Sequence, residues 1–86
     1  MNVELRPQAI EDLTWFAAHD ARLLKRALRL IEATRRDPFE GLGKPEPLRG
    51  ELSGWLSRRI DSQHRLVYRV TGEPARVQVV QARYHY

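Results

Sequence analysis

The residues best suited to chemistry stand at the end of the chain, Tyr84-His85-Tyr86. They follow an apolar run, residues 77–82, that is typical of a strand, so we expect a sheet edge to hold two aromatic rings and a histidine. The same half of the chain is rich in arginine, at Arg58, Arg59, Arg65, Arg69 and Arg83. A histidine that transfers a proton, set among fixed guanidinium groups, is what a site needs to bind and cut a phosphodiester. Composition alone slightly favours the alternative, a tail that only closes the sheet.

A loop rich in glycine and proline supplies an acid. Lys44-Pro45-Glu46-Pro47 places a carboxylate between two prolines, each of which fixes its own φ angle. Cleavage of RNA by its own 2′-hydroxyl needs a base for the hydroxyl proton, an acid for the departing 5′-oxygen and cations for the phosphoryl oxygens. Glu46 suits the base, His85 the acid and Arg65 the cation. Lys44, Arg49 and Arg59 would assist this triad. Any small basic protein offers one glutamate and one histidine, so the pattern alone leaves the triad a hypothesis.

Strand periodicity predicts which arginines share a face. If Asp61-Ser62-Gln63 is a three-residue hairpin loop, Arg59 lies opposite Arg65 and both point to the same side. The other side then carries a suitable core, made of Leu56, Ile60, Leu66, Tyr68 and Val70. Like charges directly across a sheet are destabilising, so a face of arginines with no nearby acid suits a polyanion. A solvated face with scattered arginines is an equally good interpretation, and a slip of one residue would overturn the assignment.

The turn near residues 72–75 extends this register to the end of the chain. A turn with an odd number of residues would add Arg83 and His85 to the face of Arg65 and Arg69. The core side would then receive Val80, Ala82 and Tyr84. Three other aromatic residues, Trp15, Phe16 and Trp55, are expected to pack in the core, although a strand tryptophan such as Trp55 can also stack on a nucleobase.

Helix signals precede strand signals along the chain. Residues 3–6 suggest a short strand, Pro7 is well placed to start a helix, and Asp20 to cap a second helix that ends before Pro38. Residues 39–47 contain too much Gly and Pro for a helix or a strand. Short runs then alternate with turn signals, at residues 48–52, 55–60, 64–71 and 76–84. This order predicts an α+β fold in which two N-terminal helices pack on a mainly antiparallel sheet.

Length and composition limit the possible classes of protein. A chain of 86 residues is expected to form one domain, residues 1–86, and it contains no cysteine to staple it. No apolar run approaches the ~20 residues that span a membrane, and the N-terminus lacks the apolar stretch of a signal peptide. We therefore expect a cytoplasmic protein. Fifteen Lys and Arg against eleven Asp and Glu leave a net charge of +4, which favours an anionic partner.

Four blocks of the chain form a set of motifs. They are residues 34–48, with Lys-Pro-Glu-Pro, residues 52–60, with Ser-Arg-Arg-Ile, residues 64–68, His-Arg-Leu-Val-Tyr, and residues 83–86, Arg-Tyr-His-Tyr. In this order and spacing they closely resemble the YoeB toxins, the Txe/YoeB branch of the RelE superfamily. The resemblance implies a RelE-like, microbial-ribonuclease-like fold and the toxin of a type II toxin–antitoxin system. It also implies an mRNA endonuclease that acts in the ribosomal A site, leaves a cyclic or 3′-phosphate and a 5′-hydroxyl, and uses no metal or other cofactor.

Matched motif by motif, the resemblance assigns roles to residues. Glu46 resembles the general base of the family, Arg65 its transition-state arginine and His85 its general acid. Supporting substrate contacts fall on Lys44, Arg49, Arg59 and Tyr86. Arg49 stands where lysine is common, which keeps the charge but changes the geometry. Leu56 stands where members often carry a second aromatic residue, which puts a stacking role at that position in doubt.

The resemblance also implies partners. They are a cognate YefM-like antitoxin with an acidic C-terminal segment, the ribosome and its mRNA, and operator DNA only together with the antitoxin. Whether the chain forms a homodimer stays open. His64 and His85 do not suggest a metal pair, because zinc prefers three or four ligands and the chain has no cysteine. The alternative function is a small, basic, non-catalytic RNA- or DNA-binding module of a repressor complex, in which Glu46 and His85 have no catalytic role.

Overall fold

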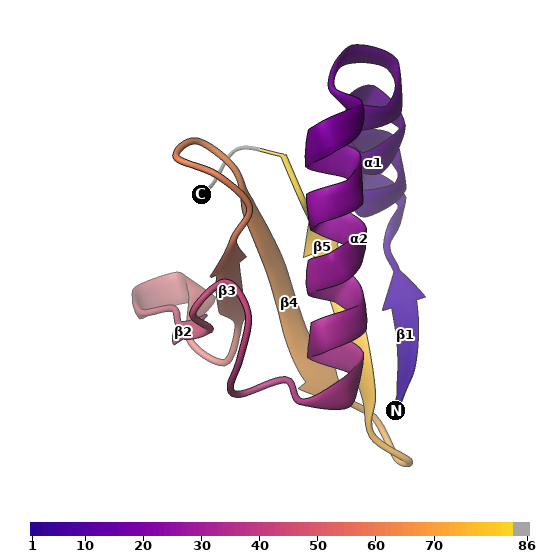
Figure 1. Ribbon diagram of the computed structural model, residues 1–86. Coiled ribbons are helices and arrows are strands. Elements are labelled where there is room, and N and C mark those ends of the chain that lie inside the picture. The colour runs from indigo at the N-terminus through magenta and orange to yellow at the C-terminus, as the bar shows by residue number, and fades with distance from the viewer. Residues whose placement is uncertain (84–86) are drawn as a thin grey trace.

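The computed structural model describes residues 1–83. A short strand, β1 (Asn2–Leu5), leads into two helices, α1 (Pro7–His19) and α2 (Ala21–Arg36), which pack on one face of a sheet (Figure 1). The remaining elements are β2 (Glu46–Pro47), a 3-10 turn η1 (Gly50–Leu52), β3 (Leu56–Arg59), β4 (Arg65–Thr71) and β5 (Arg76–Gln81). Within residues 1–83, no helix is long and apolar enough to cross a membrane. The predicted α+β class is confirmed.

Local sequence explains where the helices begin and end. Pro7 lies in the first turn of α1, where its missing N–H costs nothing. The Asp20 carboxylate accepts hydrogen bonds from the backbone N–H groups of Arg22 and Leu23, and so caps α2 as predicted. At the other end, Pro38 directly follows the residue that terminates α2. The predicted helix boundaries are therefore confirmed.

The core lies between the two helices and the sheet. The buried residues that form it include Ala9, Phe16, Ala27, Leu30, Ile60, Leu66, Tyr68, Val77 and Val79. Trp15 and Leu56 are half-buried and pack against this cluster. These placements match the core predicted for the β3–β4 hairpin, except that Val70 is half-buried and is not among the residues that form or pack against this cluster.

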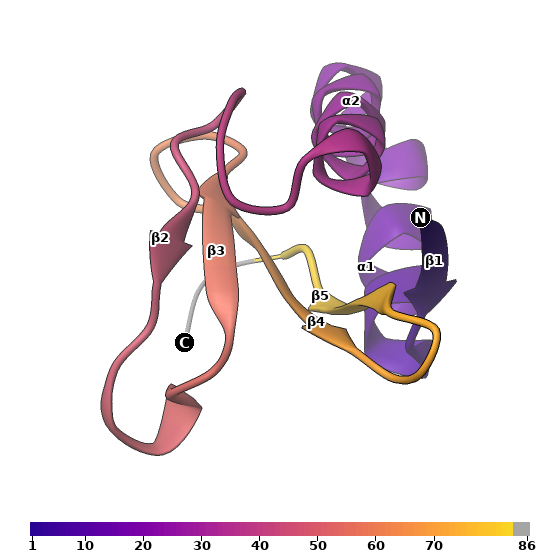
Figure 2. The same cartoon turned by 90° about the horizontal axis from the view of Figure 1, so that it is seen from below.

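The sheet is mixed, with the strand order β1-β5-β4-β3-β2. β1 runs parallel to β5, whereas the other neighbours are antiparallel, and Figure 2 shows β1 and β2 at opposite ends of the twisted sheet. In the β3–β4 hairpin the Ile60 N–H donates to the His64 carbonyl at 2.9 Å, which closes a loop of residues 61–63. Arg59 consequently pairs with Arg65, as the hairpin argument predicted.

Two predictions about irregular segments are wrong. Glu46–Pro47 was assigned to a loop but forms β2, in which Glu46 pairs with Ser57 and Pro47 with Leu56. This strand is at the edge of the sheet, where the lack of a proline N–H is tolerated. The run 48–52, grouped with the strands, instead contains the 3-10 turn, which begins at Gly50; both Gly50 and the following Gly54 have positive φ.

The connection between β4 and β5 departs from the predicted odd-length turn. Thr71 pairs with Arg76, so the turn contains four residues, 72–75. A β-bulge then shifts the register, because Tyr68 pairs with Val79 but Val67 pairs with Gln81. The extra residue is Val80, which is half-buried while Val79 occupies the core. Ala82 nevertheless reaches the core as predicted, and the expected positions of Tyr84 and His85 lie outside the described residues.

Candidate active site

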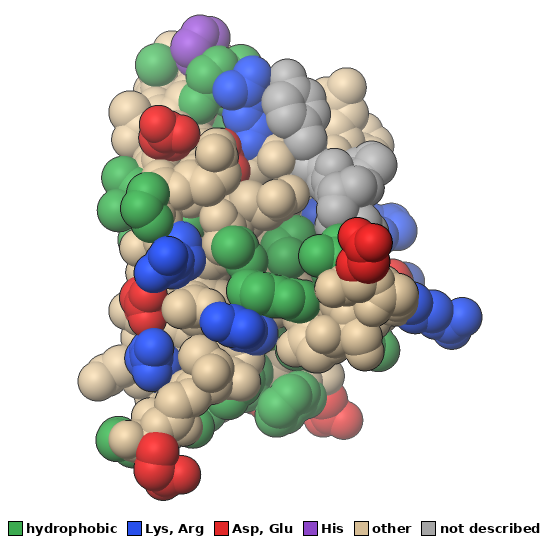
Figure 3. All heavy atoms as spheres, turned by 180° about the vertical axis from the view of Figure 1, so that it is seen from behind, with side chains coloured by type: hydrophobic (Ala, Val, Ile, Leu, Met, Phe, Trp, Pro, Cys, Tyr) green, Lys and Arg blue, Asp and Glu red, His purple; other side chains and the backbone are tan. Residues whose placement is uncertain are grey.

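The candidate site is built on the sheet face that points away from the helices. Strand alternation puts Trp55, Ser57, Arg59, Arg65 and Arg69 on this face, which we call the arginine face. In a view from behind, basic side chains are spread over the surface with isolated carboxylates between them (Figure 3). Glu46, the acid that the loop was expected to supply, reaches this face opposite Ser57, and Glu4, which was not foreseen there, joins it opposite Gln78.

Two of the three predicted catalytic residues meet on this face. Arg65 Nη1 lies 3.9 Å from Glu46 Oε2 and donates a hydrogen bond of 2.9 Å to Ser57 Oγ. The Arg65 side chain is only 20% exposed, whereas that of Glu46 is 55% exposed. An ion pair this long and this exposed is weak. The Glu46 carboxylate therefore lies beside Arg65 and is still accessible to another partner. The arrangement presents an accessible carboxylate beside a cation that is held in place by Ser57.

Sequence reasoning missed Ser57, whose residue is fully buried. Its hydroxyl accepts the hydrogen bond that orients the Arg65 guanidinium, and its backbone pairs with Glu46. The signal was present in the sequence, because Ser57 has the same strand parity as Arg59. A hydroxyl at that position of the predicted hairpin could only point toward the arginines.

The predicted supporting residues surround this pair. Arg59 is exposed beside its strand partner Arg65, and Lys44 is exposed just before β2 with its backbone at φ 51°. Arg49 is exposed at the start of the 3-10 turn. Within residues 1–83, the side-chain partners of Glu46 and Arg65 are each other and Ser57, so the structure does not bring these three cations into contact with the pair. His85 and Tyr86, predicted as general acid and substrate contact, lie outside the described residues.

Arg58 does not belong to the cluster of functional arginines, contrary to the prediction. Its side chain is fully buried on the core side of β3, as the parity of Leu56 requires. Its guanidinium donates to the carbonyls of Leu42 at 3.0 Å and Glu40 at 3.1 Å, to the Asp37 carbonyl, and from Nε to the Tyr68 hydroxyl at 3.2 Å. Arg58 therefore holds the loop that leads from α2 to Glu46.

Tyr68 extends the same anchor. Its hydroxyl donates to the carbonyl of Pro38, and burial raises the pKa of the phenol, which keeps it a donor. The loop also approaches the core closely at Gly43, where a Cβ would lie 2.7 Å from Leu30 Cδ2 and 3.2 Å from the Arg59 carbonyl oxygen. Gly43 has φ 83° besides, so both space and backbone conformation require glycine there.

Asp12 is a second residue that the sequence did not reveal, because it lies within the apolar helical pattern of α1. It is buried, and one carboxylate oxygen accepts the backbone N–H groups of Ala82 at 3.0 Å and Arg83 at 3.1 Å. The Arg83 guanidinium carbon lies 3.7 Å from the centre of the Trp15 ring. Arg83 was predicted to join the arginine face, but these contacts turn it toward α1.

The prediction that Trp55 packs in the core is wrong. Residue 55 shares the parity of Ser57, so its half-buried ring lies on the arginine face, 4.4 Å from the guanidinium carbon of Arg69.

The described part of the chain holds no group of three or more His, Asp or Glu side chains that could bind a metal. His64 is buried, with its ring edge-to-face against Phe16 at 5.2 Å between centroids.

Comparison with known proteins decides the family. Residues 5–86 match the family model of the YoeB-like toxin of the bacterial type II toxin–antitoxin system. The chain belongs to this family. Toxin YoeB of Mycobacterium bovis is 52% identical over 85 residues, which are 99% of this chain and 98% of the relative. The motif-based resemblance to YoeB is thereby confirmed.

Solved YoeB structures share the fold along the whole chain. The YoeB/ParE toxin from Agrobacterium tumefaciens has 43% sequence identity and a TM-score of 0.94, with both chains covered completely. YoeB from Staphylococcus aureus is known as a dimer, at 38% identity and TM-score 0.87, and in complex with YefM, at 37% and 0.85. Each of these alignments covers all of this chain and 98% of the other.

Proposed function

We propose that this YoeB-like toxin cleaves mRNA in the ribosomal A site. The Glu46 carboxylate takes the proton of a ribose 2′-hydroxyl, and the 2′-oxygen attacks the adjacent phosphorus. Arg65 stabilises the charge that develops on the phosphoryl oxygens. As the bond from phosphorus to the 5′-oxygen breaks, His85 donates a proton to that oxygen, which leaves a 2′,3′-cyclic phosphate and a 5′-hydroxyl.

One observation supports this proposal above the others: Glu46 Oε2 and Arg65 Nη1 lie 3.9 Å apart on an exposed face, each held by its own strand. A phosphodiester seated there would meet base and cation together, without rearrangement of the sheet. Lys44, Arg49, Arg59 and Tyr86 would contact the RNA around it. The reaction needs only proton transfer and fixed positive charge, so we propose that it uses no metal.

The proposed partners follow from relatives and charge. The S. aureus YoeB–YefM complex supports a YefM-like antitoxin, and the S. aureus dimer supports a homodimer of this chain. A net charge of +4 suits an antitoxin segment that is acidic and folds on binding. We propose that operator DNA is bound only by the toxin together with its antitoxin.

Cleavage of mRNA on programmed ribosomes tests the function. Glu46→Gln should abolish the cyclic phosphate product, detected by mass spectrometry, while ribosome binding persists. Glu73→Gln, an exposed glutamate in the β4–β5 turn, is the matched control and should cleave like the wild type. Binding without cleavage by the wild-type toxin would favour the alternative, a non-catalytic RNA- or DNA-binding module. Complete inhibition by a chelator, under conditions that preserve the ribosome, would contradict the metal-free mechanism.

A further inference from the structure

Trp55 and Arg69 form a cation–π pair on the arginine face. The register that pairs Leu56 with Tyr68 puts Trp55 directly across from Arg69. The guanidinium carbon of Arg69 lies 4.4 Å from the centre of the Trp55 ring, which is the geometry of a cation–π contact. Both side chains are half-buried, so the pair is partly accessible.

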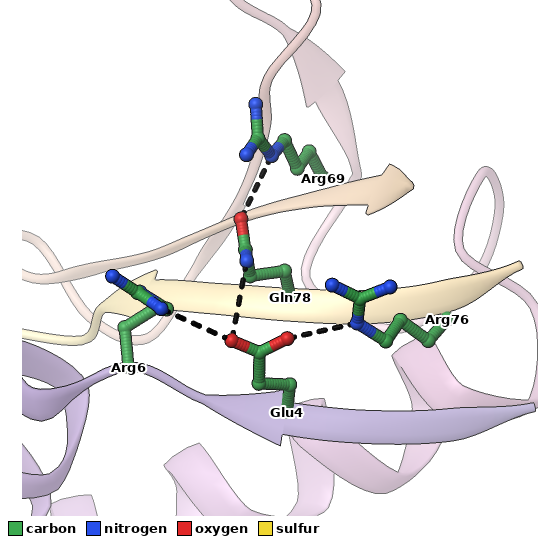
Figure 4. Close-up of polar contacts among 5 residues, drawn as sticks. All are labelled: Glu4, Arg6, Arg69, Arg76 and Gln78. Atoms are coloured by element: carbon green, nitrogen blue, oxygen red, sulfur yellow. Dashed lines mark hydrogen bonds and ion pairs between the residues drawn. The ribbon is translucent and has the colours of Figure 1, made fainter. Parts of the chain in front are cut away.

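A chain of polar contacts fixes the orientation of Arg69 (Figure 4). Its Nε donates to Gln78 Oε1 at 2.8 Å, and Gln78 Nε2 donates to Glu4 Oε2 at 3.2 Å. Glu4 also accepts hydrogen bonds from Arg76 at 2.8 Å and Arg6 at 3.3 Å, which lower the pKa of its carboxyl group. The chain thus runs from the edge strand β1 across β5 to β4.

The charges in this chain are unevenly distributed. The carboxylate of Glu4 pairs with Arg76 and Arg6, whereas Arg69 is held by the neutral amide of Gln78. Among residues 1–83, no carboxylate lies within ion-pair distance of Arg69. Arg69 therefore keeps its positive charge available while its guanidinium carbon lies over an indole ring.

The Trp55–Arg69 pair lies next to the proposed site. Trp55 is two residues before Ser57, the strand partner of Glu46, and both point to the same face. Two residues along a strand correspond to about 7 Å. This separation is comparable to that of neighbouring nucleotides in an extended single strand.

From this arrangement we infer that Trp55 and Arg69 form a subsite for the nucleotide that flanks the cleaved bond. Its base would stack on the Trp55–Arg69 pair, and the guanidinium would attract its phosphate. Stacking on a flat, cationic surface accepts any base, so the subsite contributes affinity without strong sequence preference. The inference rests on the proposed ribonuclease function.

The test uses mRNA with a 2′-deoxy nucleotide at the cleavage position, which binds but cannot be cut. In one set of messages the nucleotides next to that position are normal. In the other set an abasic nucleotide stands on one side of that position or on the other. Affinity of the toxin for programmed ribosomes is measured with both. For the wild-type toxin, removal of the stacked base should weaken binding by about tenfold to a hundredfold.

The variants identify the residues responsible. Trp55→Ala and Arg69→Ala should bind both messages equally weakly, and Arg69→Lys, which keeps the charge but loses the planar group, should also lose the preference. Trp55→Phe keeps a ring and should retain most of it, which guards against a folding defect in Trp55→Ala. An undiminished preference in Arg69→Ala and Arg69→Lys would overturn the inference.

Separate readouts distinguish this inference from the proposed function. If the wild-type toxin cleaves normal mRNA but does not distinguish normal from abasic messages, the subsite is wrong and the ribonuclease stands. If it distinguishes them but never cleaves, Trp55 and Arg69 bind a base but flank no cleaved bond, and the proposed chemistry fails.

Discussion

Arg58 and Arg59 are neighbours in β3 with the same side chain and opposite environments. Arg58 is fully buried and donates to three backbone carbonyls and one hydroxyl. The Arg59 side chain is exposed. Its backbone N–H donates to the Gly43 carbonyl, and its carbonyl accepts a hydrogen bond from the Arg26 side chain. Strand alternation alone separates the two side chains. The number of arginines in the sequence therefore overestimates the positive charge on the surface, because some of them face the core.

The comparison shows how a buried charge can position a site without touching it. No carboxylate within residues 1–83 pairs with Arg58; its acceptors are the Tyr68 hydroxyl and three carbonyl dipoles, including that of Asp37 at the negative end of α2. These contacts fix the loop from Asp37 to Gly43, and β2 with Glu46 follows directly. Arg58 supports the loop, whereas Arg65 and Arg59 lie on the face where we propose that the RNA phosphate binds.

The largest expected effect comes from removal of the buried arginine. Arg58→Met should lower the free energy of unfolding by about 3–5 kcal/mol, because the loop carbonyls lose their donor inside the protein. Arg59→Met removes an exposed charge and should change it by less than about 0.5 kcal/mol. Urea denaturation of both variants measures the contrast. Similar losses in the two would show that burial does not separate their roles.

On the arginine face, removal of an arginine should lower the rate of mRNA cleavage and leave the stability of the fold almost unchanged. Arg65→Ala should slow mRNA cleavage by about 10²–10³-fold, or roughly 3–4 kcal/mol in the barrier, as is typical when one group that stabilises developing charge is removed. Its ion pair with the half-exposed Glu46 is weak, so the urea midpoint should move little. Single-turnover cleavage and urea denaturation of the same preparation make the comparison. An unfolded Arg65→Ala protein would place Arg65 with Arg58 as a structural residue.

Asp12 offers a second buried charge that holds a segment near the site. Asp12→Ala should cost about 1–3 kcal/mol, because the backbone N–H groups of Ala82 and Arg83 lose their acceptor. Amide hydrogen exchange at these two positions should accelerate more than exchange in the centre of β4. Glu11→Ala, the exposed neighbour on α1, is the matched control and should leave that exchange unchanged. Equal exchange in the two variants would show that Asp12 does not anchor this segment.

Periodicity predicted much of this molecule, and each of its failures has an identifiable physical cause. The helix caps and the pairing of Arg59 with Arg65 depend on a few neighbouring residues, so the sequence was sufficient for them. The β-bulge at Val80 has no marker in the sequence, and the two prolines around Glu46 concealed a strand. Asp12 depends on contacts 70 and 71 residues away, which no local pattern reports. Arg58 was wrongly grouped with the functional arginines, although the strand parity that puts Leu56 in the core turns residue 58 to the same side.

The smallest expected effect concerns arginines that pair with an acid on the surface. Glu32 accepts hydrogen bonds from Arg35 and Arg36 on α2, and these contacts lower the pKa of its carboxyl group to about 2 from an ordinary value of 4.5. A folded-state pKa below the unfolded one means that the contribution is complete above about pH 4.5 and is lost as the pH falls toward 2. The wild type should therefore exceed Glu32→Gln in urea midpoint near neutral pH, by a margin that narrows between pH 5 and pH 2. Because all three side chains are exposed, the margin should be small and should shrink in salt, unlike the loss in Arg58→Met. A margin that stays constant with pH would mean that Glu32 acts through helix propensity and not through its pairing with arginine.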